Sequence, residues 1–237
     1  MTARVLLVLA LASVLAVAIS GFGARFGLWD FRLGFGILRG SAYAGIAVAV
    51  LALLALLVPR VRNGRAPALV AALVLAAGAA ALPLFWQQTA RAVPPINDIT
   101  TDPDDPPPLV ALLPLRANAR VGARYPGAET ARLQREGYPD LRPFTTPRAP
   151  REAFAAALAA ARGMGWQIIA ADEGAGRIEA TATTPWFGFV DDVVVRVRPE
   201  GSGSRIDVRS LSRVGRSDLG ANAKRIRAYL AALAGAV

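Results

Sequence analysis

Four acidic residues lie close together near the middle of the chain: Asp98, Asp102, Asp104 and Asp105. Clustered carboxylates can bind Ca²⁺ or Mg²⁺, and a metal held in this way could activate water in a hydrolase. Their spacing matches no EF-hand loop, and the prolines between them stiffen the backbone. We therefore expect a solvated acidic loop or backbone caps, with no resident metal or cofactor and with Asp98 and Asp102 as weak metal candidates.

Four arginines occupy alternating positions of two strand-like runs in the C-terminal half: Arg196, Arg198, Arg205 and Arg209. Residues two apart on a strand share a face, and a hairpin sets two such rows side by side. We expect a basic outer face that meets anionic lipid headgroups or an acidic protein surface. The alternative is ordinary surface that Glu179 and Asp207 neutralise internally.

Three residues before a predicted helix start complete the candidate anion-binding or partner-binding set: Arg213, Arg216 and Ser217. Backbone N–H groups at a helix N-terminus, together with nearby guanidinium groups, can bind an anion. The alternative is capping by Ser217 or Asp218, with Arg213 paired to Asp218 or Asp192. The segment is not a P-loop, because it lacks a Gly-Lys-Ser/Thr run.

Three aromatic residues lie in the connection between two predicted strands: Trp186, Phe187 and Phe189. They either plug one end of the domain or form an apolar lip toward a membrane or a ligand. Asp191 and Asp192 follow directly. Because adjacent residues of a strand point to opposite faces, these two carboxylates cannot act together as acid and base.

The composition excludes several kinds of chemistry. The 237 residues include no cysteine and no histidine, which excludes disulfides, thiol nucleophiles, imidazole bases and the usual zinc ligands. The formal net charge is +10, but the apolar region before Trp86 is more basic than the rest. A nucleic-acid-binding protein concentrates its positive charge in a soluble domain. We expect no nucleic-acid partner.

Three uncharged apolar runs, at residues 5–24, 40–59 and 68–85, predict transmembrane helices. At about 1.5 Å per residue, each is long enough for a hydrocarbon core about 30 Å thick. For the first run the alternative is a cleaved signal peptide, but its length and the two later spans favour a retained helix. The small residues at 76–81 either allow close helix packing or reflect base composition.

The arginines of the connection 60–67 predict the topology, because basic short loops stay in the cytoplasm. Arg4 falls on the same side, so we expect the C-terminal domain on the periplasmic side of a bacterial inner membrane. The connection 23–40 is rich in Phe, Trp, Gly and Arg. We expect it to lie among the headgroups, with Trp29 and Phe31 as interfacial anchors.

A membrane domain at 1–87 is thus followed by one α+β domain at 88–237. The expected elements are a helix from 150 to 163, strands at 166–171, 177–184, 192–198 and 205–212, and a helix from about 218. Alternation of valines on the third strand predicts one apolar face. This order gives a two-layer sandwich, an antiparallel sheet with both helices on its apolar face. The proline-rich segment 92–114 predicts an extended tether.

Three motifs in this domain resemble those of the DUF1499 family. They are Pro94–Asp102, the stretch from Gly176 through Trp186–Phe189 to Val194, and Arg209–Asn222. The resemblance covers roughly residues 93–235. The family has no established activity that could be transferred. The resemblance does imply that the proline-rich segment belongs to the domain instead of forming a free linker.

These features favour an integral inner-membrane protein that acts as a non-enzymatic binding or scaffolding module at the cell envelope. Its expected partners are membrane lipids and a membrane or periplasmic protein. The alternative function is a carboxylate- and metal-dependent hydrolase that uses Asp98 or Asp102. A deep polar pocket with two of the clustered acids would favour the hydrolase, whereas a flat basic face would favour the binding module.

Overall fold

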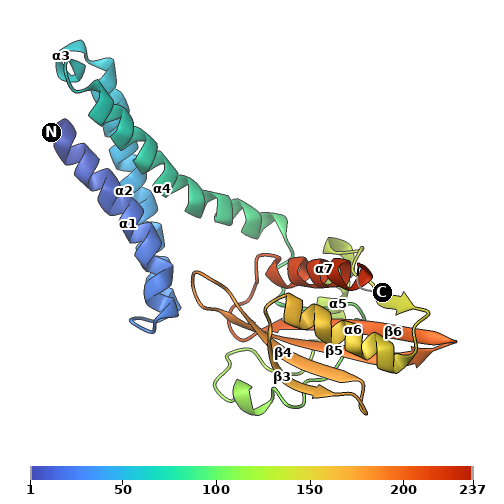
Figure 1. The fold of residues 1–237 in the computed structure, drawn as a ribbon. Coiled ribbons are helices and arrows are strands. Elements are labelled where there is room, and N and C mark those ends of the chain that lie inside the picture. The colour runs from blue at the N-terminus through green and yellow to red at the C-terminus, as the bar shows by residue number, and fades with distance from the viewer. Residues whose placement is uncertain (1, 236–237) are drawn as a thin grey trace. The chain divides into compact units, whose positions relative to one another are not determined.

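The computed structural model describes residues 2–235, and the chain folds as two compact units (Figure 1). The first unit comprises Met1–Arg91 together with the short segment Pro185–Gly188. The second unit comprises Ala92–Thr184 and Phe189–Val237. The first is helical and the second is an α+β domain, as the sequence predicts.

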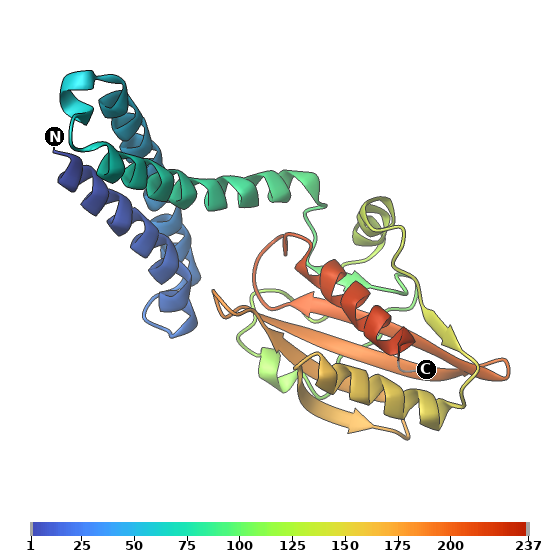
Figure 2. The same cartoon turned by 45° about the horizontal axis from the view of Figure 1, so that its top comes forward.

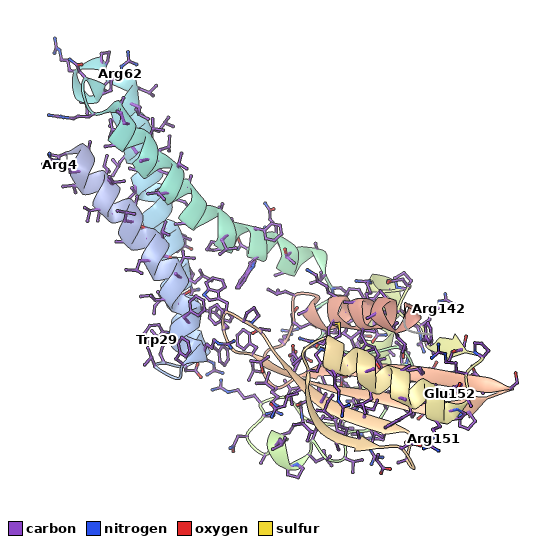
Figure 3. All side chains as sticks on the ribbon, in the orientation of Figure 1. Arg4, Trp29, Arg62, Arg142, Arg151 and Glu152 are labelled. Atoms are coloured by element: carbon purple, nitrogen blue, oxygen red, sulfur yellow. The ribbon has the colours of Figure 1, made fainter. Side chains whose placement is uncertain are left out.

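The first unit contains the helices α1 (Ala3–Arg25), α2 (Phe31–Leu57), α3 (Pro59–Arg62) and α4 (Ala66–Ala92). α1, α2 and α4 are long and apolar enough to cross a membrane. The prediction of three such helices is confirmed. Arg4 and Arg62 lie at one end of this unit and Trp29 at the other (Figure 3).

The helix boundaries differ from those expected. α2 begins at Phe31 instead of near residue 40, because Asp30 caps it by accepting a hydrogen bond from Arg32 N at 2.9 Å. Most of the predicted headgroup connection is therefore helix, and only the link between α1 and α2 is irregular. The 27 residues of α2 reach about 40 Å, so the helix exceeds a hydrocarbon core of about 30 Å.

Small residues bring α2 and α4 together. A Cβ atom on Gly45 would lie 2.7 Å from the carbonyl oxygen of Ala76, so the two backbones almost touch there. Ala72, Ala76 and Ala80 follow one another at four-residue spacing on α4 and are buried. Ala76, Ala79 and Ala80 of the small-residue run are thus buried, as close helix packing requires, whereas Ala77, Gly78 and Ala81 are exposed. α4 also contains Pro83 and bends along its length (Figure 1), as expected where proline removes a backbone donor.

The second unit is built on one antiparallel sheet. Its strands are β1 (Asp98–Thr100), β2 (Phe144–Thr146), β3 (Gln167–Asp172), β4 (Arg177–Thr183), β5 (Val190–Glu200) and β6 (Gly203–Ser212). The order is β1-β6-β5-β4-β3, and β2 also pairs with β6. The four predicted strands are confirmed. β1 and β2, which were not predicted, bind the edge of β6 at different positions along it.

Two helices, α6 (Pro150–Gly163) and α7 (Ala221–Ala234), lie side by side on one face of this sheet (Figure 2). Val193, Val195 and Val197 of β5 face them in the main core. Trp166 and Tyr229 stack there with ring centroids 4.9 Å apart. The predicted sheet with both helices on its apolar face is therefore confirmed. A further helix, α5 (Ala128–Gly137), and a short 3₁₀ helix, η1 (Pro114–Arg116), complete the unit.

The opposite face of the sheet is covered by the proline-rich segment and the residues that follow it. Leu109 and Leu112 pack there against Val194 and Leu211 in a separate small core. Since Val194 alternates with Val193 and Val195 along β5, the two cores lie on opposite faces. The proline-rich segment is thus part of the domain, as the family resemblance implied, and the tether interpretation is wrong.

Candidate functional site

The covered face of the sheet carries a layer of arginines and carboxylates. Arg196 donates hydrogen bonds to Asp207 Oδ2 at 2.9 Å and to Asp105 Oδ2 at 3.0 Å. Arg205 binds Asp102 Oδ2 at 2.7 Å and Asp207 Oδ1 at 2.9 Å. Asp207 is fully buried. These guanidinium groups therefore stabilise buried carboxylates beneath the proline-rich segment.

Arg198 and Arg209 belong to the same layer. Arg198 donates to Asp102 Oδ2 at 3.2 Å and to Asp105 Oδ2 at 3.1 Å, and its side chain is 37% exposed. Arg209 is 3% exposed and holds both oxygens of Asp98, at 2.9 and 2.7 Å. Burial raises the pKa of the Asp98 carboxyl, while the two hydrogen bonds from Arg209 oppose that rise.

The four strand arginines therefore do not form a free cationic stripe. Arg196, Arg198 and Arg205 share a face, as expected, but Asp102 and Asp105 come from the covering segment to neutralise them. Arg209 is buried. The expectation of an open charged face is wrong, because residues about a hundred positions earlier in the chain fold onto it. The assignment of these arginines as partner-binding residues stays a prediction.

The N-terminus of α7 is capped by residues of the preceding loop, which was the alternative to anion binding. The Asp218 carboxylate accepts hydrogen bonds from Gly220 N at 2.8 Å and from Asn222 N at 2.7 Å. Ser217 Oγ accepts from Leu219 N at 3.2 Å. Burial raises the pKa of Asp218. The helix N-terminus is thus already occupied by a carboxylate of the chain itself.

The two arginines of this loop differ in environment. Arg213 pairs with Asp192 at 2.7 Å, one of the two partners proposed from the sequence, and Arg116 binds the same carboxylate. Arg216 is exposed to solvent. Of the two, Arg216 is therefore the one whose charge faces solvent.

Asp191 and Asp192 engage different partners, as their adjacency on a strand predicts. Asp191 binds Arg225 of α7 at 2.6 Å. Asp192 is turned toward Arg213 and Arg116 on the other face. The pair therefore cannot share a substrate or a metal.

A buried polar network that sequence reasoning missed joins β6, α7 and the segment before β1. Asn222 is fully buried, and its amide donates to Asn97 O at 2.9 Å and to Ser212 Oγ at 3.0 Å. Its own oxygen accepts from Ser210 Oγ at 2.6 Å. These residues lie within the first and third family-like motifs. The sequence clue to this network was a group of polar residues at the end of a strand. Since the polar groups of the network have hydrogen-bond partners, the network stabilises the fold.

The aromatic connection lies partly in the first unit, which includes Pro185–Gly188. Within that unit Trp186 Nε1 donates to Ala18 O at 3.0 Å, and the ring of Phe187 lies 4.9 Å from that of Phe35. Phe187 is 4% exposed and is absent from the core of the sheet. Phe189 begins the return to β5, and its backbone N donates to Thr184 Oγ1 at 2.8 Å. The role of the lip toward a ligand stays a prediction.

A pocket of about 320 Å³ lies beside α5. Arg135, Arg142, Gln134 and Tyr138 line it together with Thr101, and no carboxylate does. Burial raises the pKa of Tyr138 to about 12, so its hydroxyl stays protonated at neutral pH. The pocket therefore lacks the two clustered acids that would have favoured a hydrolase.

The clustered acids are bound by arginines. Within residues 2–235 no group of three or more acidic side chains is placed to hold a metal ion. Asp98 is held by Arg209, and Asp102 is shared among three arginines. Asp104 binds Arg135 at 2.6 Å on the surface.

The fold and this site define a protein with apolar helices that can span a membrane, joined to an α+β domain with a buried arginine–carboxylate layer. A family model described as a protein of unknown function, DUF1499, matches residues 98–233. The chain belongs to this family, which confirms the resemblance drawn from its three motifs. No curated protein and no solved structure matches the chain.

Proposed function

We propose that this chain is an integral protein of the bacterial inner membrane whose periplasmic domain acts by binding and scaffolding at the cell envelope. The proposed partners are membrane lipids and a membrane or periplasmic protein. Three helices with the length and apolar character of membrane spans support the location. The basic connection between α2 and α4 supports the orientation.

The main support for a binding role is that the buried acidic side chains already have partners within the domain. Asp98, Asp192 and Asp207 are buried and bound by arginines. Glu179 is buried and accepts backbone hydrogen bonds. A carboxylate that already has strong hydrogen-bond partners is poorly placed to accept a proton from substrate or to bind a metal. The acids therefore stabilise the domain, which leaves its surface to carry function.

Metal titration separates this proposal from the hydrolase alternative. We expect Mg²⁺, Mn²⁺ and Ca²⁺ to leave the Tm of the full chain in mild detergent unchanged. A ligand at a hundred times its Kd stabilises a protein by about 2.7 kcal/mol, which would raise Tm by several degrees. A rise of this kind that Asp102→Asn abolishes and Asp104→Asn leaves intact would support the hydrolase and contradict our proposal.

The lipids that co-purify with the chain test the binding role directly. We expect mass spectrometry of the purified full chain to find anionic phospholipids enriched over zwitterionic ones, relative to the bulk membrane extract. The enrichment should decrease in high salt, because the attraction is electrostatic. Lipid proportions equal to those of the bulk membrane would contradict lipid binding.

A further inference from the structure

The segment that covers the sheet face opposite α6 and α7 includes a turn with exposed apolar side chains. Within the described residues of that unit, the large apolar side chains that are exposed are Val110, Leu113 and Leu115, at 47%, 47% and 50%. All three lie in residues 110–115, which we call the apolar turn. Exposed apolar side chains concentrated in one short segment mark a contact surface more often than scattered ones do.

The turn is held firmly in this exposed position. The Glu179 carboxylate accepts hydrogen bonds from the backbone N–H groups of Val110, Ala111 and Leu112, at 2.9, 3.0 and 2.9 Å. Leu112 is fully buried in the small core on this face of the sheet. Arg116, which ends η1, is 6% exposed and donates to Val121 O at 2.9 Å. The exposure of the three side chains is therefore a fixed feature of the fold.

The charge around the turn is positive. Residues 106–128 include three arginines and no acid. Arg116 is buried, whereas Arg124 is exposed. Exposed apolar side chains beside an exposed arginine suit an anionic bilayer surface, where the apolar groups reach the acyl boundary and the guanidinium group binds phosphate.

The connection to α4 keeps the domain near a bilayer. α4 ends at Ala92 and β1 begins at Asp98. The five intervening residues can span at most about 18 Å. A domain on so short a connection meets a bilayer crossed by α4 far more often than it meets a soluble partner.

We propose that the apolar turn, with Arg124, docks on the anionic phospholipid surface of the membrane that the helices cross. This inference rests on the proposed membrane location, and it replaces the strand arginines with a different lipid-facing surface. Three half-exposed side chains offer far less area than the roughly 800 Å² per partner of a stable protein interface. A lipid surface needs no such area, since partial insertion of a few side chains suffices.

Depth-dependent quenching tests the docking on the full chain. The protein has no cysteine, so Leu113→Cys gives one labelling site for a polarity-sensitive fluorophore. The chain is reconstituted in nanodiscs that contain phosphatidylglycerol and spin-labelled lipid. We expect strong quenching at this position and several-fold less at Glu152→Cys, a control on the exposed side of α6 (Figure 3).

The arginine contribution has a matched control. Arg124→Gln should weaken docking by roughly fivefold and should reduce its dependence on phosphatidylglycerol. Arg162→Gln changes one exposed arginine elsewhere on the domain and should leave the quenching unchanged. An unaltered Tm in each variant shows that the domain remains folded.

Three outcomes would overturn the inference. Absent quenching at Leu113→Cys in correctly filled nanodiscs would mean that the turn stays in water. Equal quenching at both labelled positions would mean that docking is not specific to the turn. If the label is shielded from water without lipid quenching, and native mass spectrometry gives twice the chain mass, the turn contacts a second copy of the chain. A chain that cannot be reconstituted into nanodiscs would instead contradict the membrane location.

Discussion

Glu179 lies fully buried on the face of the sheet opposite α6 and α7, and each of its oxygens accepts two hydrogen bonds. Three of the donors are consecutive backbone N–H groups, and the fourth is Arg177 Nε at 3.0 Å. A carboxylate suits this position because it has acceptors on both oxygens and no donor. Glu179, which the sequence suggested as a neutraliser of the strand arginines, instead binds the backbone of the apolar turn.

Glu179→Gln tests this role. The amide would place its NH₂ group against backbone N–H donors, leaving buried polar groups unsatisfied, which costs on the order of 2–3 kcal/mol. In a domain of this size that lowers the Tm by about 5–10 °C. The measurement is thermal unfolding of the full chain in detergent.

Glu173→Gln is the control for that measurement. Glu173 forms an exposed ion pair with Arg151 at 3.4 Å, and such pairs contribute about 0–1 kcal/mol. Similar Tm values for both variants and the unmodified chain would show that the apolar turn does not depend on Glu179.

At the scale of elements, the pattern of apolar residues determined which helices and strands could be predicted from the sequence. Alternating valines placed β5 correctly with one face toward the helices, and uncharged runs located α1, α2 and α4. The covering segment has no periodicity, and contacts such as Asp102 with Arg205 join residues 103 positions apart. Spacing along the chain does not encode such a pairing. The strand arginines were therefore expected on an open face and the apolar turn was not recognised.

The α2–α4 contact gives the element-scale prediction. Gly45→Ala would place a methyl group 2.7 Å from Ala76 O and 3.4 Å from Ala80 N. Because both neighbours are backbone atoms, the helices must separate, at a cost of about 1–3 kcal/mol. Denaturation of the helical unit in mixed detergent micelles measures the loss.

Gly40→Ala in the same helix is the matched control, since nothing lies within 4 Å of a Cβ atom there. Alanine favours helix over glycine by about 1 kcal/mol, so this variant should be no less stable than the unmodified chain. If Gly45→Ala is equally well tolerated, the small-residue contact does not hold the two helices together.

At the scale of the whole molecule, the distribution of charge and aromatic residues along the helices determines the proposed orientation. The end with Arg4 and Arg62 also carries Arg60 and Arg65. The opposite end has the aromatic residues Phe22, Trp29 and Phe35. That end also has Arg25 and Arg32, fewer than the four arginines of the first end, so it competes less strongly for the cytoplasm.

Reporter fusions test this orientation. The three arginines near α3 resist translocation, so a fusion of alkaline phosphatase at Asn63 should be inactive in a bacterial host, and one after Val237 should be active. Replacing Arg60, Arg62 and Arg65 by glutamine should weaken this preference and produce mixed activity at both sites, because the arginines near Trp29 then compete for the cytoplasm. The converse replacement of Arg25 and Arg32 should sharpen the original pattern. The opposite pattern of activity in the unmodified chain, or cleavage of the chain near residue 20, would contradict three retained spans with a periplasmic domain. Either result would also contradict docking of the apolar turn on the periplasmic face of the membrane.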